Sequence, residues 1–518
     1  MKQKKNKGTI VGTVVFHICI LLLAILMFSL KWAKDNYGNI GFEEIVFHLN
    51  MTLKGTAESL LLSYAMRTLV PAVGVLVLWL AFYYWPARKR FVLELKVWKK
   101  NMGIQLFPLR LGFVGNFLLI LCCFGLLISD ANSSFGFLEY VKNQLQQSKL
   151  IEEEYVDPAT TSITFPEKKR NLITIYLESG ETSNQDKANG GYFDENIIPE
   201  MTEIAKSNIS FSQSDLIEGA CVAPACGWTI AALVAQTAGL PLKLYSYADR
   251  GVDNTMNQYK SFMPGATTLG DILAEQGYHN YFMCGSDFDF GGRKIYFKQH
   301  GDYGVWEYVT ASRRGLLDED YKVWWGFEDQ KLYSYAKIKL LELASEDTPF
   351  NFSMLTVDTH HPDGYVCEIC PDTYEEQYSN VWACASAQVA EFLEWIKEQD
   401  FYENTTVVIV GDHCSMDADY YEELTYDKHV GETERKVYNA FINSVAEPVN
   451  EKNRKFTTMD MFPTVLASIG AEIEGERLGL GTNLFSEEET LSEKYGYEYL
   501  FAELNKKSSF YNNEILFP

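Results

Sequence analysis

The chain has 518 residues, 47% of them hydrophobic, and a formal net charge of −24. This length accommodates a membrane segment together with one large or two ordinary domains. The sequence has no basic stripe, which argues against nucleic acid as a partner and against docking on anionic lipid through a polybasic patch.

Three apolar runs near the N-terminus are long enough to cross a bilayer: Thr9–Leu30, Leu69–Trp85 and Leu111–Ser129. The first follows several lysines, but it is longer than a signal peptide and no small-x-small cleavage site comes after it, so we expect an uncleaved anchor. Between the first two runs, the segment Asn36–Met66 carries aromatic and acidic residues and is expected to lie along the outer membrane interface.

Basic residues predict the orientation of the anchor. They cluster in Lys2–Lys7 and again in Arg88–Arg110, and both clusters should lie in the cytoplasm. Three spans then place everything from Asp130 onward outside the cytoplasm. A re-entrant second segment would reverse this inference.

The rest of the chain reads as a stalk followed by one large domain. The polar helical pattern of Glu139–Tyr155 and a linker with two prolines predict a stalk over 131–168, after an anchor over 1–130. A catalytic domain over 169–518 follows, in which helical patterns alternate with four apolar strands: Asn171–Leu177, His279–Cys284, Phe350–Val357 and Thr405–Val410. This alternation predicts an α/β fold with a mainly parallel sheet covered by helices on both faces.

Polar side chains follow three of these strands. Glu178 ends the first, Asp358 and His360 follow the third, and Asp412-His413 ends the last. Sites in open α/β sheets form beyond the carboxyl ends of the strands, so these residues are expected to meet at one edge. Taken singly, each also fits an ordinary helix cap or polar turn.

Thr229 is the candidate nucleophile. It lies where a turn rich in Pro and Gly, within Cys221–Pro241, leads into a short apolar helix, and the helix dipole there favours a phosphate. The alternative is a simple N-cap. With the oxygens of Glu178 and Asp412 and the nitrogen of His413, Thr229 would complete a four-ligand site for a divalent ion that activates its hydroxyl.

Arg293 follows a strand and a Gly-Gly turn, where its guanidinium would clamp phosphate oxygens. The alternative is an ordinary surface arginine.

Cysteine use leaves several pairings open. Cys19, Cys122 and Cys123 lie in the predicted spans as small apolar residues. Cys367-Glu-Ile-Cys370 favours a local disulfide over half a zinc knuckle, because no second Cys-x-x-Cys or His pair follows it. Cys221 with Cys226 would staple the turn before Thr229. At least one thiol stays unpaired, since seven cysteines lie in the outer part: Cys221, Cys226, Cys284, Cys367, Cys370, Cys384 and Cys414.

The motifs together resemble the alkaline-phosphatase-like superfamily, and within it the membrane phosphoglycerol transferases related to lipoteichoic acid synthase. The similarity rests on Ile175-Tyr-Leu-Glu178-Ser179, Gly227-Trp-Thr229, Asp358-Thr-His360-His361-Pro-Asp-Gly364 and Gly411-Asp412-His413. The segments Cys226-Gly-Trp-Thr-Ile-Ala and Arg477-Leu-Gly-Leu-Gly-Thr-Asn-Leu-Phe485 resemble most closely the branch that acts on periplasmic glucans. The similarity covers about 350 residues of the outer domain, a usual size for one α/β domain.

The resemblance implies one divalent ion, often Mn²⁺ in this family, with Mg²⁺ and Zn²⁺ as alternatives. It implies Glu178, Thr229, Asp412 and His413 as its ligands, and His360 and Arg293 as contacts to the transferred glycerol phosphate. We add His361 and Trp228 to the predicted substrate contacts. The implied location is the bacterial cell membrane, with several spans and an extracytoplasmic catalytic domain. The acceptor, the oligomeric state and the processivity stay open.

The implied reaction is transfer of glycerol phosphate from phosphatidylglycerol to a glycan or polyol, through a covalent intermediate on Thr229. Cys284 stands where lipoteichoic acid synthases carry a His, and those enzymes usually have five spans, so single transfer is favoured over polymerisation. A phosphoethanolamine transferase is an alternative with the same chemistry. A sulfatase would need Cys-x-Pro-x-Arg, which Cys221-Val-Ala-Pro-Ala-Cys does not match. A non-catalytic receptor would be expected to have lost these ligands.

Overall fold

The computed structural model describes residues 7–37, 40–49, 56, 58–84, 92–97, 100–105, 113–243, 261–318, 320–417, 420 and 435–518. These residues belong to two compact units. The first comprises Met1–Asn39 and Ala57–Glu139, and the second comprises Ile40–Thr56 and Tyr140–Pro518. Most of the basic residues on which the predicted orientation depends, such as Lys2 and Arg88, lie outside the described residues.

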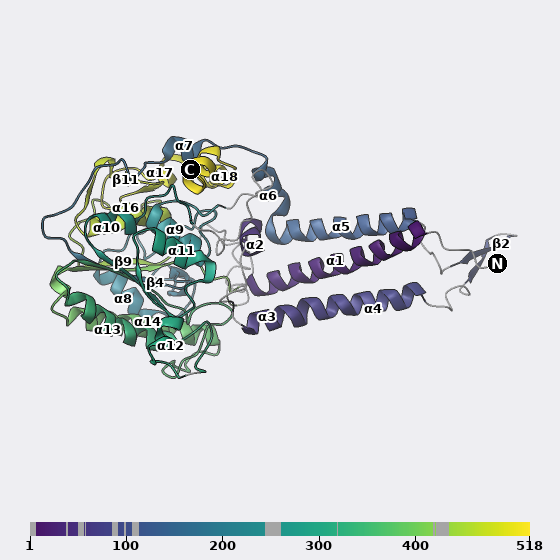
Figure 1. Ribbon diagram of the computed structural model, residues 1–518, viewed down its shortest axis with the longest axis horizontal. Coiled ribbons are helices and arrows are strands. Elements are labelled where there is room, and N and C mark those ends of the chain that lie inside the picture. Colours follow the sequence, from purple (N-terminus) through teal and green to yellow (C-terminus); the bar gives the residue numbers. More distant parts are fainter. Residues whose placement is uncertain are drawn as a thin grey trace. The chain divides into compact units, whose positions relative to one another are not determined.

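The first unit consists of long apolar helices and one hairpin (Figure 1). Three helical stretches are long and apolar enough to cross a membrane, which confirms the three predicted spans by length and composition: Val11–Tyr37, Ser59–Tyr84 and Gly115–Phe135. The elements that form them are α1 (Lys7–Tyr37), the consecutive α3 (Glu58–Tyr64), η1 (Ala65–Leu69) and α4 (Val70–Tyr84), and α5 (Phe113–Phe135). The hairpin pairs β1 (Val92–Val97) with β2 (Lys100–Gln105).

The second span is longer than its sequence pattern indicated. The apolar run begins at Leu69, but the helical stretch suited to cross the membrane begins ten residues earlier, at Ser59, and continues through the π-helical turn η1 into α4. A stretch of 26 residues at about 1.5 Å rise per residue is sufficient to cross the hydrocarbon core.

The second unit is built on a six-stranded sheet in the order β6-β5-β7-β4-β8-β9. The predicted strands are all present, as β4 (Asn171–Leu177), β5 (His279–Cys284), β7 (Phe350–Leu355) and β8 (Thr405–Gly411). The edge strands are β6 (Gly304–Trp306), which is parallel to β5, and β9 (Asn439–Ile442), which is antiparallel to β8. β4 lies at the centre, parallel to both β7 and β8, as the prediction of a mainly parallel sheet requires.

Helices cover both faces of this sheet. Alternate residues of β4 point to opposite faces, and each set packs in a core with a different group of helices. Leu172 and Tyr176 pack in the same core as α9 (Thr229–Ala238), α10 (Leu269–Glu275), α11 (Arg293–Gln299) and α16 (Met461–Ser468). Ile173 and Ile175 pack in the core that contains α8 (Pro199–Ser207), α13 (Asp329–Ala344) and α14 (Gln377–Lys397). The α/β fold with two covered faces is therefore confirmed.

Smaller elements complete the unit, and one of them, α6, begins at the end of the first unit. They are α2 (Phe42–Leu49), α6 (Phe137–Gln144), α7 (Leu150–Glu154), β3 (Ile163–Thr164), α12 (Tyr308–Arg313), β10 (Glu472–Ile473), β11 (Arg477–Leu478), β12 (Gly481–Thr482), α17 (Leu491–Tyr495) and α18 (Tyr497–Asn505). Single turns are η3 (Thr182–Asn184), η5 (Phe290–Gly292), η6 (Tyr402–Asn404), η7 (Thr458–Asp460), η8 (Glu474–Glu476) and η9 (Tyr511–Leu516).

The expected stalk packs partly on this unit instead of standing free. Leu150 and Ile151 of α7 are buried in the core. The buried carboxylate of Glu154 accepts hydrogen bonds from Arg477 Nη1 at 3.1 Å and Lys494 Nζ at 2.7 Å. An exposed polar helix would not bury these side chains, so α7 is part of the second unit.

Candidate metal centre and nucleophile

Three of the predicted ligands meet at the carboxyl edge of the sheet. Glu178 follows β4, and Asp412 and His413 follow the neighbouring strand β8. One ligand atom from each lies within 4.8 Å of the others, and all three side chains are buried. His413 Nε2 is 3.6 Å from Glu178 Oε1 and 3.4 Å from Asp412 Oδ2.

Two glycines allow the ligands to come this close. Gly180 and Gly411 face each other after β4 and at the end of β8, and a Cβ atom at Gly411 would lie 1.8 Å from the carbonyl oxygen of Gly180. Any side chain at Gly411 would therefore push the two chain segments apart. Since Glu178 and Asp412 lie one or two residues from these glycines, the backbone contact sets the spacing between the two carboxylates.

The hydrogen bonds around Asp412 and His413 suit a metal ion. Asp412 Oδ1 accepts from the backbone N–H groups of Ser179 and His413, at 2.8 and 2.7 Å, whereas its buried Oδ2 accepts from no described residue. His413 Nδ1 lies 2.9 Å from the carbonyl oxygen of Cys414, to which it donates in the tautomer that leaves Nε2 with a lone pair toward the carboxylates. One oxygen and one nitrogen are thus positioned as ligands.

Burial and neighbouring charges shift the pKa values of Asp412 and His413. Burial and the nearby Glu178 raise the pKa of Asp412 to about 7. Burial lowers the pKa of His413, but the charges of Asp412 and Glu178 raise it overall. Two buried carboxylates side by side are costly without a cation, and a divalent ion between them would compensate their charge. The donor set of two carboxylates, an imidazole and a hydroxyl fits such an ion.

Thr229 lies at this cluster as the first residue of α9. Its Oγ1 donates to Glu178 Oε2 at 3.4 Å, and its side chain is only half-buried, so it is accessible from outside. The N-cap residue is Trp228, without a side-chain cap hydrogen bond, so the alternative that Thr229 is only an N-cap is wrong. The first N–H groups of a helix have no intrahelical partner, so the start of α9 favours an anion next to Thr229.

Arg293 is not a surface residue. It is buried at the start of α11, which follows Gly291 and Gly292 with φ of 69° and 78°. Its Nε donates to the carbonyl oxygen of Phe290 at 3.1 Å, and its Nη2 donates to Ser286 and Asp287 at 3.0 and 2.7 Å. These bonds hold the guanidinium in a fixed orientation.

The predicted substrate contacts His360 and His361 stack on each other, with ring centroids 4.5 Å apart. Burial lowers the pKa of His360, partly offset by the charge of Glu178, and the charges of His413 and Arg293 lower it further. His360 therefore lies within electrostatic reach of the metal ligands and of Arg293. Trp325, which was not among the predicted site residues, packs on His360 with ring centroids 4.7 Å apart.

A second contact to the site that the sequence analysis did not predict comes from α2, in the segment between the first two spans. Phe47 of α2 is 1% exposed and packs on the indole of Trp228 with ring centroids 4.9 Å apart. The charge of Glu44, also in α2, raises the pKa of His413. α2 thus packs within the second unit through Phe47, a contact that the amphipathic pattern of this segment did not predict. An amphipathic pattern alone does not say which surface it covers.

Comparison with known proteins gives the family of this domain. Residues 170–471 match the sulfatase family, and since they make up more than half of the chain, the protein belongs to it. The mainly parallel sheet, with two carboxylates and an imidazole at its carboxyl edge, is therefore the framework of a sulfatase-family domain.

Among the relatives is phosphoglycerol transferase I of Salmonella choleraesuis (strain SC-B67), 31% identical over 373 residues. These residues are 69% of this chain and 44% of the relative, so the chain spans less than half the length of the curated relatives it matches. The phosphoglycerol transferase I of Salmonella typhi shows the same identity and coverage.

A solved lipoteichoic acid synthase from Listeria monocytogenes is also similar, with a TM-score of 0.48 and 18% identity over 66% of this chain and 82% of that one.

Proposed function

We propose that this protein transfers glycerol phosphate from phosphatidylglycerol to a glycan or polyol acceptor, with Thr229 as the nucleophile. The observation that carries the proposal is the position of the half-buried Thr229 at the start of α9, with its hydroxyl 3.4 Å from Glu178 in the cluster with Asp412 and His413. The name of the phosphoglycerol transferase I relatives supports phosphoglycerol as the transferred group. Three helices long enough to span a membrane would hold the domain near a lipid donor.

In the first half-reaction, Thr229 Oγ1 would attack the phosphorus of the lipid. A bond forms from Oγ1 to phosphorus, the bond from phosphorus to the diacylglycerol oxygen breaks, and that oxygen leaves as the hydroxyl of diacylglycerol. In the second half-reaction, a hydroxyl oxygen of the acceptor would bond to the phosphorus as the bond from phosphorus to Thr229 Oγ1 breaks. The proton of that acceptor hydroxyl would pass to Oγ1 and restore the threonine. Glycerol phosphate is thus carried by the threonine between donor and acceptor.

The residues around Thr229 would have separate roles. Glu178, Asp412 and His413 would hold a divalent ion, Mn²⁺ in our proposal, which supplies positive charge that lowers the pKa of the nucleophile and neutralises the phosphate. The N–H groups at the start of α9 would donate to phosphate oxygens. Arg293 and His360 would bind the same oxygens or the glycerol hydroxyls, with His361 and Trp228 lining the site. The catalytic domain would lie outside the cytoplasm of a bacterial cell.

Intact-mass analysis of the full-length protein in detergent tests this proposal. With phosphatidylglycerol and Mn²⁺, the chain should gain the mass of one glycerol phosphate and release diacylglycerol, and the Thr229→Ala variant should do neither. Addition of phosphoethanolamine from phosphatidylethanolamine, without reaction of phosphatidylglycerol, would replace the proposal by a phosphoethanolamine transferase. Neither adduct nor diacylglycerol with either lipid would refute transfer through Thr229.

A further inference from the structure

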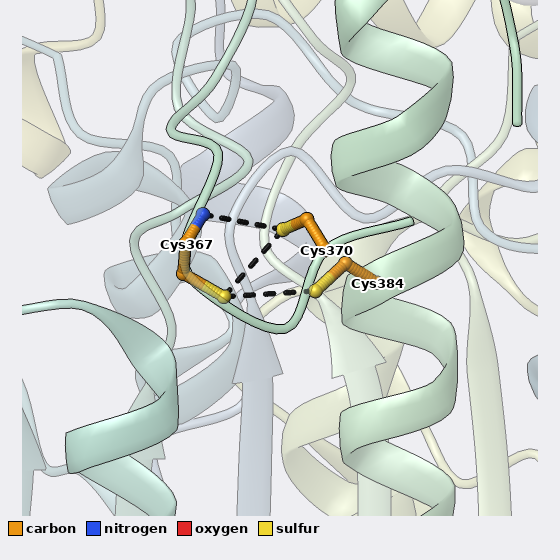
Figure 2. Close-up of side chains that lie close together, drawn as sticks. All are labelled: Cys367, Cys370 and Cys384. Atoms are coloured by element: carbon orange, nitrogen blue, oxygen red, sulfur yellow. Dashed lines mark hydrogen bonds between the residues drawn. The ribbon is translucent and has the colours of Figure 1, made fainter. Parts of the chain in front are cut away.

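Three cysteine side chains lie together in the catalytic unit, apart from the metal centre (Figure 2). Cys367 and Cys370 come from the loop after β7, and Cys384 comes from α14. The sulfur of Cys367 is 3.5 Å from that of Cys370 and 3.7 Å from that of Cys384. Cys367 and Cys384 are buried, and Cys370 is half-buried.

The spacing of the sulfur atoms fits a tetrahedral metal ion. With Zn–S bonds of about 2.3 Å, two thiolates at the corners of a tetrahedron are about 3.8 Å apart. Both measured separations are close to this value. A Cys-x-x-Cys turn with a third cysteine from a helix supplies three corners, and the half-buried position of Cys370 leaves access for a water molecule at the fourth.

Two N–H groups point at these sulfurs. The backbone N–H of Cys367 donates to Cys370 Sγ at 3.3 Å, and Gln388 Nε2 donates to Cys384 Sγ at 3.3 Å. Such donors stabilise thiolates, the form in which cysteine binds metals.

We propose that Cys367, Cys370 and Cys384 form a structural site for a thiophilic divalent ion, Zn²⁺ in the first place. This site is independent of the transferase proposal. A disulfide between two of these cysteines would leave the third thiol without a function in the cluster, whereas a metal ion uses all three.

The site would fix the loop that carries two predicted substrate contacts. Cys367 lies six residues after His361, and Tyr378 of α14 already donates to the carbonyl oxygen of Thr359 in the same loop at 2.6 Å. An ion shared by Cys367, Cys370 and Cys384 would tie the other end of this loop to the same helix. Loss of the ion should therefore loosen the loop while the sheet stays folded.

Elemental analysis of the full-length protein, purified in detergent without chelator, tests the site. We expect one Zn²⁺ per chain, retained in the Asp412→Asn variant and lost in the Cys384→Ser variant. Cys221→Ser is the matched control, since it removes an equally buried thiol outside the cluster and should keep the ion. The Asp412→Asn arm separates this ion from one held at the metal centre.

A second measurement on the wild-type chain does not depend on whether the variants fold. After metal removal and denaturation, alkylation should label Cys367, Cys370 and Cys384, and Co²⁺ added to the folded chain should give thiolate-to-cobalt charge-transfer absorption. A chain in which two of the three cysteines resist alkylation until reduced contains a disulfide, and this result would overturn the proposal. A zinc content that does not change in Cys384→Ser would also overturn it.

Discussion

Phe47 gives the sharpest prediction about how the site is assembled, because it connects α2 to Trp228, the residue before the proposed nucleophile Thr229. Its ring is 1% exposed and packs on Trp228, the N-cap residue of α9. Truncation of a fully buried Phe to Ala costs about 3–5 kcal/mol, which includes the lost ring–ring contact of about 0.5–1.5 kcal/mol. We expect the Phe47→Ala variant to release α2 while the six-stranded sheet stays folded.

Hydrogen exchange followed by mass spectrometry measures this release. Because each 1.4 kcal/mol is a factor of ten, amides in 42–49 should exchange roughly two to four orders of magnitude faster in Phe47→Ala. Amides of β4 and β8 should be unaffected. Formation of the phosphoglycerol adduct should slow, since Thr229 follows Trp228 directly. Leu49→Ala is the matched control, as Leu49 is 78% exposed on the same helix.

Hydrogen exchange of the amides in 42–49 at the wild-type rate in the Phe47→Ala variant would contradict this prediction. In that case the burial of Phe47 does not hold α2 in place. Equal acceleration in Leu49→Ala would show instead that any change in α2 releases it.

Three further predictions concern the nucleophile, the metal centre and a buried lysine. Thr229→Ser should retain the mass adduct that Thr229→Ala loses, because the serine keeps the hydroxyl; loss in both variants would contradict a simple nucleophile. Asp412→Asn should abolish Mn²⁺ binding in calorimetric titration while the melting temperature without metal changes little, since its oxygen still accepts from Ser179 and His413; unchanged binding would exclude Asp412 as a ligand. Burial lowers the pKa of Lys243 from 10.5 to about 8. Between these two pH values the unfolded chain binds a proton that the folded chain does not, so the free energy of unfolding should rise by about 3 kcal/mol as the pH increases from 8 to 10.5. Urea titrations should show that rise in the wild type and its absence in Lys243→Met.

The strands and the ligands at their ends could be predicted because the signal is local. Asn171–Leu177 and Thr405–Gly411 are rich in apolar and β-branched residues, and Glu178 and Asp412 follow directly, so the rule for parallel sheets brings them to one edge. The antiparallel edge strand β9 escaped prediction because its four residues carry little pattern of their own.

What could not be predicted depends on contacts between distant segments. The sequence of α2 shows an apolar side, but only the tertiary structure places Phe47 on Trp228. Cys384 reaches Cys367 because α14 passes the loop after β7, and no spacing rule for zinc sites signals a third ligand on a helix. The polar pattern of Glu139–Tyr155 likewise concealed Leu150 and Ile151, which are buried.

The position of α2 makes the second unit discontinuous in sequence, because one piece of it lies between two helices that are long enough to cross a membrane. A soluble fragment that starts at Asp130 would therefore lack eight residues of its own fold. Such a fragment would expose the indole of Trp228 beside the nucleophile, and it would tend to self-associate through that apolar surface. Kinetic constants measured on it would describe an incomplete enzyme, whereas joining 40–56 to the fragment through a short linker would restore the missing part.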